Sequence, residues 1–351
     1  MMHGGNVWQG GAPSAWLDFS ANLRPEGAPE WVRRAMLEGM ENARYYPDPQ
    51  MRRARAALAE YLDLEADCVL PTAGGISAIA MAARLPVQSM RAFAPCFCEY
   101  GQMAALQGVR MEEISLLRAP HEILRPVETL GGTEISDCAL WLYNPLNPVG
   151  VAFSPEEVEA LLERAEAEKG WLIVDEAFIE FCPENSMRSR IGRHARLIVT
   201  GSMTKALGIP CVRLGYLCAQ PELIDELGRS QLTWELNAFA EAVLCALPRH
   251  VEELRKDAKE NVARRERLKA GLEALGAFVY PSSANFLLAD FGRDVAPVAA
   301  RLRTSGILVR ECTNFSGVDD GRHLRLAVKD EAANARLLEE LKGALVCAEN
   351  H

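Results

Sequence analysis

Short hydrophobic runs alternate along this chain with longer segments in which apolar residues recur at helical spacing. The runs predict β-strands at 68–72, 90–95, 139–145, 171–178, 196–202 and 213–219. In the intervening segment SPEEVEALLERAEAEKG, Ser154 and Glu157 have the spacing of a capping box, which predicts that a helix begins there. Alternating strands and helices are typical of an α/β fold with a mostly parallel sheet.

The pattern changes near residue 250. A charged amphipathic helix is expected over about 250–275, and it leads into a smaller α+β unit that closes with the helical stretch KDEAANARLLEELKGAL. The strands of this unit are expected near 285–290, 306–310 and 323–328. We therefore predict a Gly/Pro-rich N-terminal arm at 1–30 that packs against another element, a large domain at 31–249 and a small C-terminal domain at 250–351.

Length and charge narrow the classes of protein. With 351 residues, 49% of them hydrophobic, the chain can bury a large core. Its 48 acidic residues outnumber 38 basic ones, the net charge is −10 and the cations are dispersed, which argues against a nucleic-acid partner. We find no signal peptide and no segment near the roughly 18 apolar residues that span a bilayer. We expect a soluble cytoplasmic protein with no membrane partner.

The ten cysteines are scattered, several of them inside apolar runs such as CALWLY and EAVLCALP. No C-x-x-C pair occurs, and the paired spacings with histidine that metal ligation needs are missing, so we predict no metal site. The cysteines are interpreted as small buried hydrophobes in a reducing compartment.

Polar residues of chemical interest follow the predicted strands. Asp175 ends the run WLIV, Asn147 lies in the loop YNPLNPVG after another strand, Lys205 follows a third, and Arg213 opens the next. Each has an ordinary explanation on its own, for example a turn residue for Asp175 and a Pro/Asn loop around Asn147. Because ligands of open α/β sheets bind at the carboxyl ends of strands, their shared placement predicts one site.

Lys205 lies in the tight, uncharged turn GSMTKALGIPCVRLGYL, where a second cation, Arg213, follows. Poor solvation and a nearby cation destabilise an ammonium group, so the free amine becomes available to form a Schiff base with an aldehyde. Pyridoxal phosphate is such an aldehyde, and it needs a carboxylate at its pyridine nitrogen, donors for its phenolic oxygen and a phosphate cradle. These places would be filled by Asp175, Asn147 and the set Ser202, Thr204 and Arg213.

The series N-P-x-N-P-x-G, D-E-A-F, S-x-T-K and R-L-G-Y resembles the fold-type I superfamily of pyridoxal-phosphate-dependent aminotransferases over nearly the whole chain. The resemblance implies a large domain with a mostly parallel seven-stranded sheet between helices, and a smaller α+β C-terminal domain. It also implies pyridoxal 5'-phosphate as cofactor and a homodimer with its active site at the interface.

The resemblance assigns roles to individual residues. Lys205 would hold the cofactor covalently, Asp175 would pair with its ring nitrogen, Asn147 would bond its phenolic oxygen, and Phe97 would stack on the ring unless it is ordinary core. The cofactor phosphate would be bound by backbone N–H groups of Gly75 and Ile76 and by side chains of Ser77, Ser202 and Arg213. Tyr46 matches a tyrosine that reaches the partner's cofactor phosphate. The loop TAGGISAI (72–79) departs from the family, which usually has polar residues, often with Glu, after its glycine.

Several stretches indicate one branch of the superfamily. HGGN, LDFSANLRPEG, RYYPDP, TWELNAFA and ILVRECTNFSG resemble L-threonine-O-3-phosphate decarboxylases, which are close kin of histidinol-phosphate aminotransferases. Phe178 of DEAF stands where the aminotransferases usually carry tyrosine, so one donor to the phenolic oxygen is missing. The substrate would be a small phosphorylated amino acid. Arg325 matches the arginine for its α-carboxylate and Arg310 a second arginine near the substrate; the residues matched to its phosphate are His3, Gly4 and Asn22.

The activity that the resemblance implies is decarboxylation of O-phospho-L-threonine to (R)-1-amino-2-propanol phosphate in cobalamin biosynthesis. The nearest alternative is an aminotransferase for histidinol phosphate or a related amino acid. A PLP-sensing regulator would need a DNA-binding module, which is not visible before the first strand. A degenerate enzyme kept as an interaction protein is the remaining alternative, because the 72–79 loop is altered.

Overall fold

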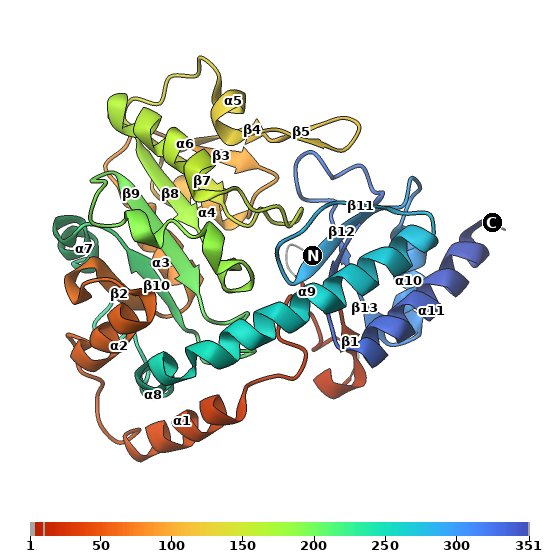
Figure 1. Ribbon diagram of the computed structural model, residues 1–351, viewed down its shortest axis with the longest axis horizontal. Coiled ribbons are helices and arrows are strands. Elements are labelled where there is room, and N and C mark those ends of the chain that lie inside the picture. Colours follow the sequence, from red (N-terminus) through yellow and green to blue (C-terminus); the bar gives the residue numbers. More distant parts are fainter. Residues whose placement is uncertain (1–3, 10, 350–351) are drawn as a thin grey trace.

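The computed structural model describes residues 4–9 and 11–349. One part is built on a seven-stranded sheet and the other on a four-stranded sheet, and the long helix α9 (Val251–Ala274) runs from the first to the second (Figure 1). The fold class predicted from the sequence is confirmed. The domain boundaries near residues 30 and 250 stay predictions. No helix within the described ranges has the length and hydrophobicity needed to cross a membrane.

The large sheet contains all six strands that the apolar runs predicted. Its spatial order is β2 (Val69–Thr72), β10 (Gly215–Cys218), β9 (Leu197–Ser202), β8 (Trp171–Asp175), β7 (Cys138–Tyr143), β3 (Ser89–Ala94) and β4 (Arg110–Ser115). Strand β10 is antiparallel to both of its neighbours, and the other pairs are parallel. Every residue of β7 and β9 is buried, because helices cover a parallel sheet on both faces.

The seventh strand, β4, was not among the predicted runs. It lies at the edge of the sheet and pairs only with β3 in the spatial order. Its sequence RMEEIS is half charged, and its side chains are partly or fully exposed. An edge strand with a solvated side does not need a continuous apolar run, so hydrophobicity gave no signal for it.

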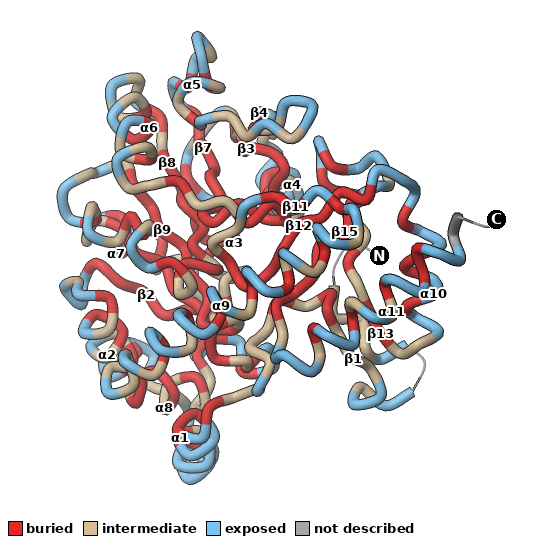
Figure 2. The backbone as a smooth tube through the Cα atoms, turned by 45° about the vertical axis from the view of Figure 1, so that its right-hand side comes forward, coloured by how far each residue is buried: buried red, intermediate tan, exposed pale blue. Residues whose placement is uncertain are grey.

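Helices pack on both faces of the large sheet, with α6 on one face and α3 and α4 on the other (Figure 1). The inner strands of the sheet are buried, whereas the edge strand β4 is partly exposed and the outer helices are buried on their inner sides only (Figure 2). The capping box is confirmed: the Ser154 hydroxyl accepts from the Glu157 N–H (3.3 Å), and the Glu157 carboxylate accepts from the Ser154 N–H (2.9 Å). The helices are α1 (Glu30–Glu41), α2 (Arg52–Leu62), α3 (Gly75–Ala82), α4 (Glu99–Leu106), α5 (Pro126–Leu130), α6 (Pro155–Ala167), α7 (Pro221–Gly228) and α8 (Ala238–Ala246).

Short elements connect these helices and strands. The antiparallel pair β5 (Leu117–Arg118) and β6 (Glu122–Ile123) follows β4. The 3-10 turns are η1 (Pro13–Ala15), η2 (Ala66–Cys68), η3 (Ile179–Phe181), η4 (Pro183–Asn185), η5 (Arg188–Arg190) and η6 (Leu247–His250).

The C-terminal sheet is antiparallel. Its order is β11 (Phe278–Val279), β12 (Phe286–Asp290), β15 (His323–Ala327) and β14 (Arg310–Glu311), and it packs with α9, α10 (Ala296–Thr304) and α11 (Glu331–Glu349). The strand predicted at 306–310 is divided between two sheets. Its first half, β13 (Ile307–Leu308), pairs in parallel with β1 (Leu17–Asp18), and its second half is β14.

The N-terminal segment therefore packs against the C-terminal part of the chain. Phe19 is fully buried among the residues of that core. Its N–H donates to the Leu308 carbonyl (2.8 Å), and its carbonyl accepts from the Ala327 N–H (2.9 Å). The residues that follow Phe19 are consequently fixed beside β15.

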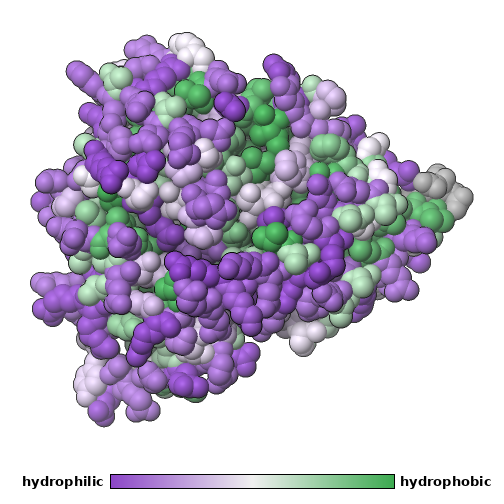
Figure 3. Space-filling view, in the orientation of Figure 1, coloured by the Kyte–Doolittle hydropathy of each residue, from purple (hydrophilic) through white to green (hydrophobic). Residues whose placement is uncertain are grey.

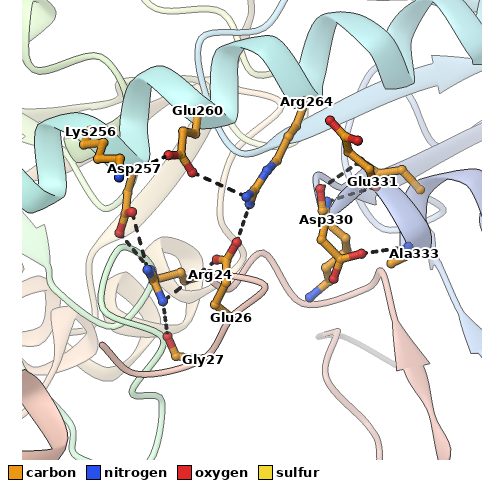
Figure 4. A network of polar contacts seen from close by, with 12 residues as sticks. Arg24, Glu26, Gly27, Lys256, Asp257, Glu260, Arg264, Asp330, Glu331 and Ala333 are labelled. Carbon is orange, nitrogen blue, oxygen red and sulfur yellow. Dashed lines mark hydrogen bonds and ion pairs between the residues drawn. The ribbon is translucent and has the colours of Figure 1, made fainter. Parts of the chain in front are cut away.

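Helix α9 holds the next stretch of the N-terminal segment in place. Its solvent-facing side chains contribute to a hydrophilic band across one face of the molecule (Figure 3). Arg24 Nε lies 2.8 Å from an Asp257 oxygen, and a guanidinium nitrogen of Arg264 lies 2.6 Å from a Glu26 oxygen (Figure 4). The Arg24 N–H also donates to the Lys205 carbonyl (3.2 Å). The loop thus connects α9 to the turn that carries Lys205.

We predict that Phe19→Ala lowers the free energy of unfolding by about 3–5 kcal/mol, the usual loss for a buried phenylalanine. The midpoint of urea unfolding measures this loss. Trp8→Ala is the matched control, because the Trp8 side chain is exposed and should change the midpoint little. Equal midpoints for the two variants would contradict the anchoring role of Phe19.

Candidate active site

A cavity of about 490 Å³ lies at the carboxyl ends of the parallel strands of the large sheet. Most predicted site residues line it: Gly4, Asn22, Gly75, Ile76, Phe97, Asn147, Asp175, Phe178, Ser202, Thr204, Lys205, Arg213, Arg310 and Arg325. The topology explains this convergence, because Asp175 ends β8, Ser202 ends β9 and Asn147 follows β7. Side chains at the ends of adjacent parallel strands meet at one edge of the sheet.

Lys205 lies in the turn after β9, and only part of it is exposed. Burial and, after it, the charges of Arg325 and Arg213 together lower the pKa of its amine to about 8, and Asp175 opposes the shift. Its Nζ is 5.8 Å from the centre of the Phe178 ring. A substantial fraction of neutral amine at physiological pH is what a nucleophile for an aldehyde requires.

Asp175 is buried at the end of β8 and is held in one orientation. One carboxylate oxygen accepts from the Tyr100 hydroxyl (2.7 Å), and the other accepts from the Ala177 N–H (3.1 Å). Burial raises the pKa of Asp175 to about 6 in spite of these hydrogen bonds. A cationic ring nitrogen beside the carboxylate would stabilise its charged form. Sequence reasoning missed Tyr100, whose phenol is fully buried behind the predicted site.

Two buried arginines from the C-terminal sheet reach the same cavity. Arg325 donates to the Asn147 side-chain oxygen (2.7 Å) and to the Ser20 carbonyl (2.8 Å). Arg310 is its partner in the β14–β15 register and bonds the Asn314 side chain. Burial lowers the pKa of Arg325 to about 10, which still leaves it charged at neutral pH. Arg310 and Arg325 are therefore charged groups inside the cavity, and neither is a surface charge on an edge strand.

The turn between β2 and α3 has a shape that admits an anion. Gly74 has a φ of 85°, and a Cβ there would lie 2.5 Å from an Arg213 nitrogen. Gly75 begins α3 and lines the cavity together with Ile76, and the first N–H groups of a helix have no partner within it. Arg213 does not open a strand as predicted. It lies in a left-handed turn with a φ of 58°, and β10 starts at Gly215.

The remaining predicted residues lie outside this cavity or outside the described residues. The Ser77 hydroxyl bonds Glu235 and is not part of the cavity lining. Tyr46 is 79% exposed and stacks on Trp234, with ring centres 4.4 Å apart. His3 lies outside the described residues. The roles predicted for these three residues stay predictions.

Glu235 is a polar neighbour of the glycine turn that sequence reasoning missed. One of its oxygens accepts from the Ala73 N–H (2.9 Å) and from the Ser77 hydroxyl. It therefore holds the residues on either side of Gly74 and Gly75. The segment TWELNAFA resembles a family motif, but nothing in it indicates that Glu235 contacts a loop more than 150 residues away along the chain.

The residues present fit pyridoxal phosphate. Lys205 offers an amine, Asp175 a carboxylate and Asn147 an amide on one cavity wall, while the α3 N-terminus, Ser202 and Arg213 surround a place for a phosphate. The buried Thr204 hydroxyl has no hydrogen-bond partner among the described residues, as expected for a group that meets a ligand. Within residues 4–9 and 11–349, no cluster of three or more His, Cys, Asp or Glu side chains could hold a metal ion.

The fold and this site define a pyridoxal-phosphate enzyme of the fold-type I class. The chain belongs to the aminotransferase class I and II family, whose model matches residues 14–341. It is 32% identical to the threonine-phosphate decarboxylase of Salmonella typhimurium, with 98% of this chain and 96% of that protein covered. The crystal structure of the histidinol-phosphate aminotransferase from Clostridium acetobutylicum superposes with a TM-score of 0.86 at 28% identity, covering 93% and 98% of the two chains.

A third comparison concerns the cofactor. The fold also matches histidinol-phosphate aminotransferase from Sinorhizobium meliloti in complex with pyridoxal-5'-phosphate, at a TM-score of 0.82 and 20% identity, covering 93% of this chain and 90% of that one. Family membership and the fit of the cavity agree, and the cofactor of this protein is pyridoxal 5'-phosphate.

The pKa of Lys205 predicts how cofactor capture depends on pH. Because only the neutral amine attacks the aldehyde, the rate at which cofactor-free protein captures pyridoxal phosphate should rise about tenfold per pH unit below pH 8 and level off above it. Stopped-flow absorbance measures the rate. Lys329→Ala, which removes a lysine outside the cavity, should keep this profile, and Lys205→Ala should abolish covalent capture. A rate that keeps rising up to about pH 10, as for an ordinary lysine, would contradict the lowered pKa.

Glu235 should matter for the phosphate group of the cofactor. We expect Glu235→Ala to weaken pyridoxal phosphate binding roughly five- to tenfold, the net value of about one hydrogen bond, and to leave binding of pyridoxal unchanged. Fluorescence titration of cofactor-free protein with both compounds gives the two affinities. Glu235→Gln keeps an acceptor and is the matched control. Equal losses of affinity for pyridoxal phosphate and for pyridoxal would indicate that Glu235 has a general structural role instead.

Proposed function

We propose that this protein decarboxylates O-phospho-L-threonine to (R)-1-amino-2-propanol phosphate, in the cytoplasm and in the service of cobalamin biosynthesis. The observation that supports this most directly is the pair of buried arginines, Arg310 and Arg325, beside Lys205 in one cavity. A substrate with a carboxylate and a phosphate has one anionic group for each of the two arginines, and its amine would bind at the cofactor aldehyde. The 32% identity to a threonine-phosphate decarboxylase over almost the whole chain supports the same choice.

In this proposal, two arginines bind the substrate and Lys205 transfers a proton. When bound, pyridoxal phosphate supplies an electron sink that accepts the electron pair from the breaking bond at the substrate α-carbon. Arg325 binds the α-carboxylate, and its bonds to Asn147 and Ser20 fix its orientation. Arg310 binds the substrate phosphate together with Gly4 and Asn22 of the N-terminal loop. Lys205 Nζ is the group that delivers a proton to the α-carbon after carbon dioxide leaves.

The choice between decarboxylation and transamination depends on orientation. The bond that breaks at the α-carbon must stand perpendicular to the cofactor plane, either the bond to the carboxylate or the bond to hydrogen. In our proposal, anchoring of the carboxylate by Arg325 and of the phosphate by Arg310 selects the bond to the carboxylate. These two arginines are register partners on β14 and β15, so the pairing of the two strands sets the spacing between them.

The second candidate function is an aminotransferase that acts on histidinol phosphate or a related amino acid. The observation that favours it is the fit to the histidinol-phosphate aminotransferase from Clostridium acetobutylicum, which covers 93% of this chain. Phe178 argues against it, because its ring lies beside Lys205 without a hydroxyl.

The assembly in this proposal is a homodimer with the active site at its interface. The surface residues that support it are aromatic: Tyr46 and Trp234 are 79% and 47% exposed and stack on each other next to the loop that contains Glu235. In this arrangement Tyr46 extends to the cofactor phosphate of the partner. Large exposed aromatic pairs of this kind are typical of association surfaces.

The test of the proposed function is the product formed from O-phospho-L-threonine by the cofactor-loaded protein. We expect release of carbon dioxide with an equal amount of aminopropanol phosphate, and L-threonine should be a far poorer substrate because it has no group for Arg310. Parallel reactions with 2-oxoglutarate detect the alternative. Formation of an oxo acid without carbon dioxide would establish an aminotransferase, and Lys205→Ala should give neither product.

A further inference from the structure

Tyr143 is a phenol in the cofactor cavity to which neither the motifs nor the proposed reaction gives a role. It is the last residue of β7 and the register partner of Asp175 on β8, so the two residues lie side by side at the carboxyl edge of the sheet. Its side chain is buried and belongs to the cavity lining. Tyr143 therefore lines the same cavity as Asp175 and Asn147.

The surroundings of Tyr143 keep it protonated and oriented. Burial raises the pKa of its phenol well above the usual range, and the charge of Asp175 adds to this shift. A side-chain hydrogen bond from Asn147 reaches the phenol, and Asn147 in turn accepts from Arg325 (2.7 Å). The phenol oxygen is thus held from one side, while its own proton remains available to donate.

The facing aromatic residue lacks such a proton. The rings of Tyr143 and Phe178 stack at an angle of 26° with their centres 6.0 Å apart, and both residues line the cavity. Phe178 has no hydroxyl, so of these two stacked rings only Tyr143 can donate to an acceptor in the cavity. The phenolic oxygen of pyridoxal phosphate is an anionic acceptor next to the position for Asn147.

We propose that Tyr143 donates a hydrogen bond to the phenolic oxygen of the bound cofactor and so takes the place of the hydroxyl that position 178 lacks. This inference rests on the cofactor and not on the substrate. Tyr143 would then set how readily Lys205 Nζ is protonated while it holds the cofactor, because a donor to the phenolic oxygen competes with that nitrogen for the oxygen's charge.

The experiment is a pH titration of the visible absorbance of the cofactor-loaded protein without substrate. Tyr143→Phe removes only the hydroxyl and should raise the midpoint by on the order of one pH unit, a tenfold change in the protonation equilibrium. Tyr280→Phe is the matched control, since Tyr280 is a buried tyrosine outside the cavity, and it should leave the midpoint unchanged. Phe178→Tyr added to Tyr143→Phe should bring the midpoint back down.

Three results would overturn the proposal. The first is an unchanged midpoint in Tyr143→Phe with the cofactor fully bound. The second is a midpoint in the double variant that stays as high as in Tyr143→Phe alone. If Tyr143→Phe does not fold, the single variant Phe178→Tyr is measured instead. A midpoint that shifts little in this variant supports the proposal. A midpoint lower by a full pH unit overturns it. Because no substrate is present, a failure here is distinguishable from a failure of the proposed function.

Discussion

The excess of positive charge in the cavity is the constraint on which the site depends. Lys205, Arg213, Arg310 and Arg325 line a space whose acidic groups are Asp175 and Glu99. Burial and neighbouring cations lower the pKa of Lys205 to about 8 and that of Arg325 to about 10. Holding these charges close together in the folded protein therefore costs free energy. Anionic ligands remove that cost. A cofactor phosphate and a substrate with two anionic groups are therefore the partners that the cavity is suited to bind.

Segments far apart in the chain keep these cations in place. The N-terminal loop connects α9 to the Lys205 turn through Arg24, and the Ser20 carbonyl in the same loop accepts from Arg325. Glu235 holds the glycine turn that faces Arg213. Each contact ties a polar group to a segment far away in the chain, which limits the motion of groups that must meet a ligand with a precision of fractions of an ångström.

Sequence reasoning placed candidate residues at one edge of the sheet where each of them follows a buried strand. The apolar runs before Asp175, Asn147 and Lys205 located three strand ends, and the parallel topology brought those ends together. Sequence reasoning failed where the local pattern of residues gives little information about the structure. Strand β4 is half charged and lies at the edge, and Arg213 occupies a left-handed turn that its sequence did not reveal.

The sequence by itself determined the fold class and the chemistry, because hydrophobic periodicity and the motifs around Lys205 are local properties. Only the tertiary structure decided which distant groups support that chemistry. Tyr100 reaches Asp175, Glu235 reaches the glycine turn, and Tyr143 faces Phe178. These contacts depend on the directions of side chains from separate elements, and no pattern along the chain encodes such directions. The physical reason is that burial and electrostatic environment arise only after the strands and loops have packed.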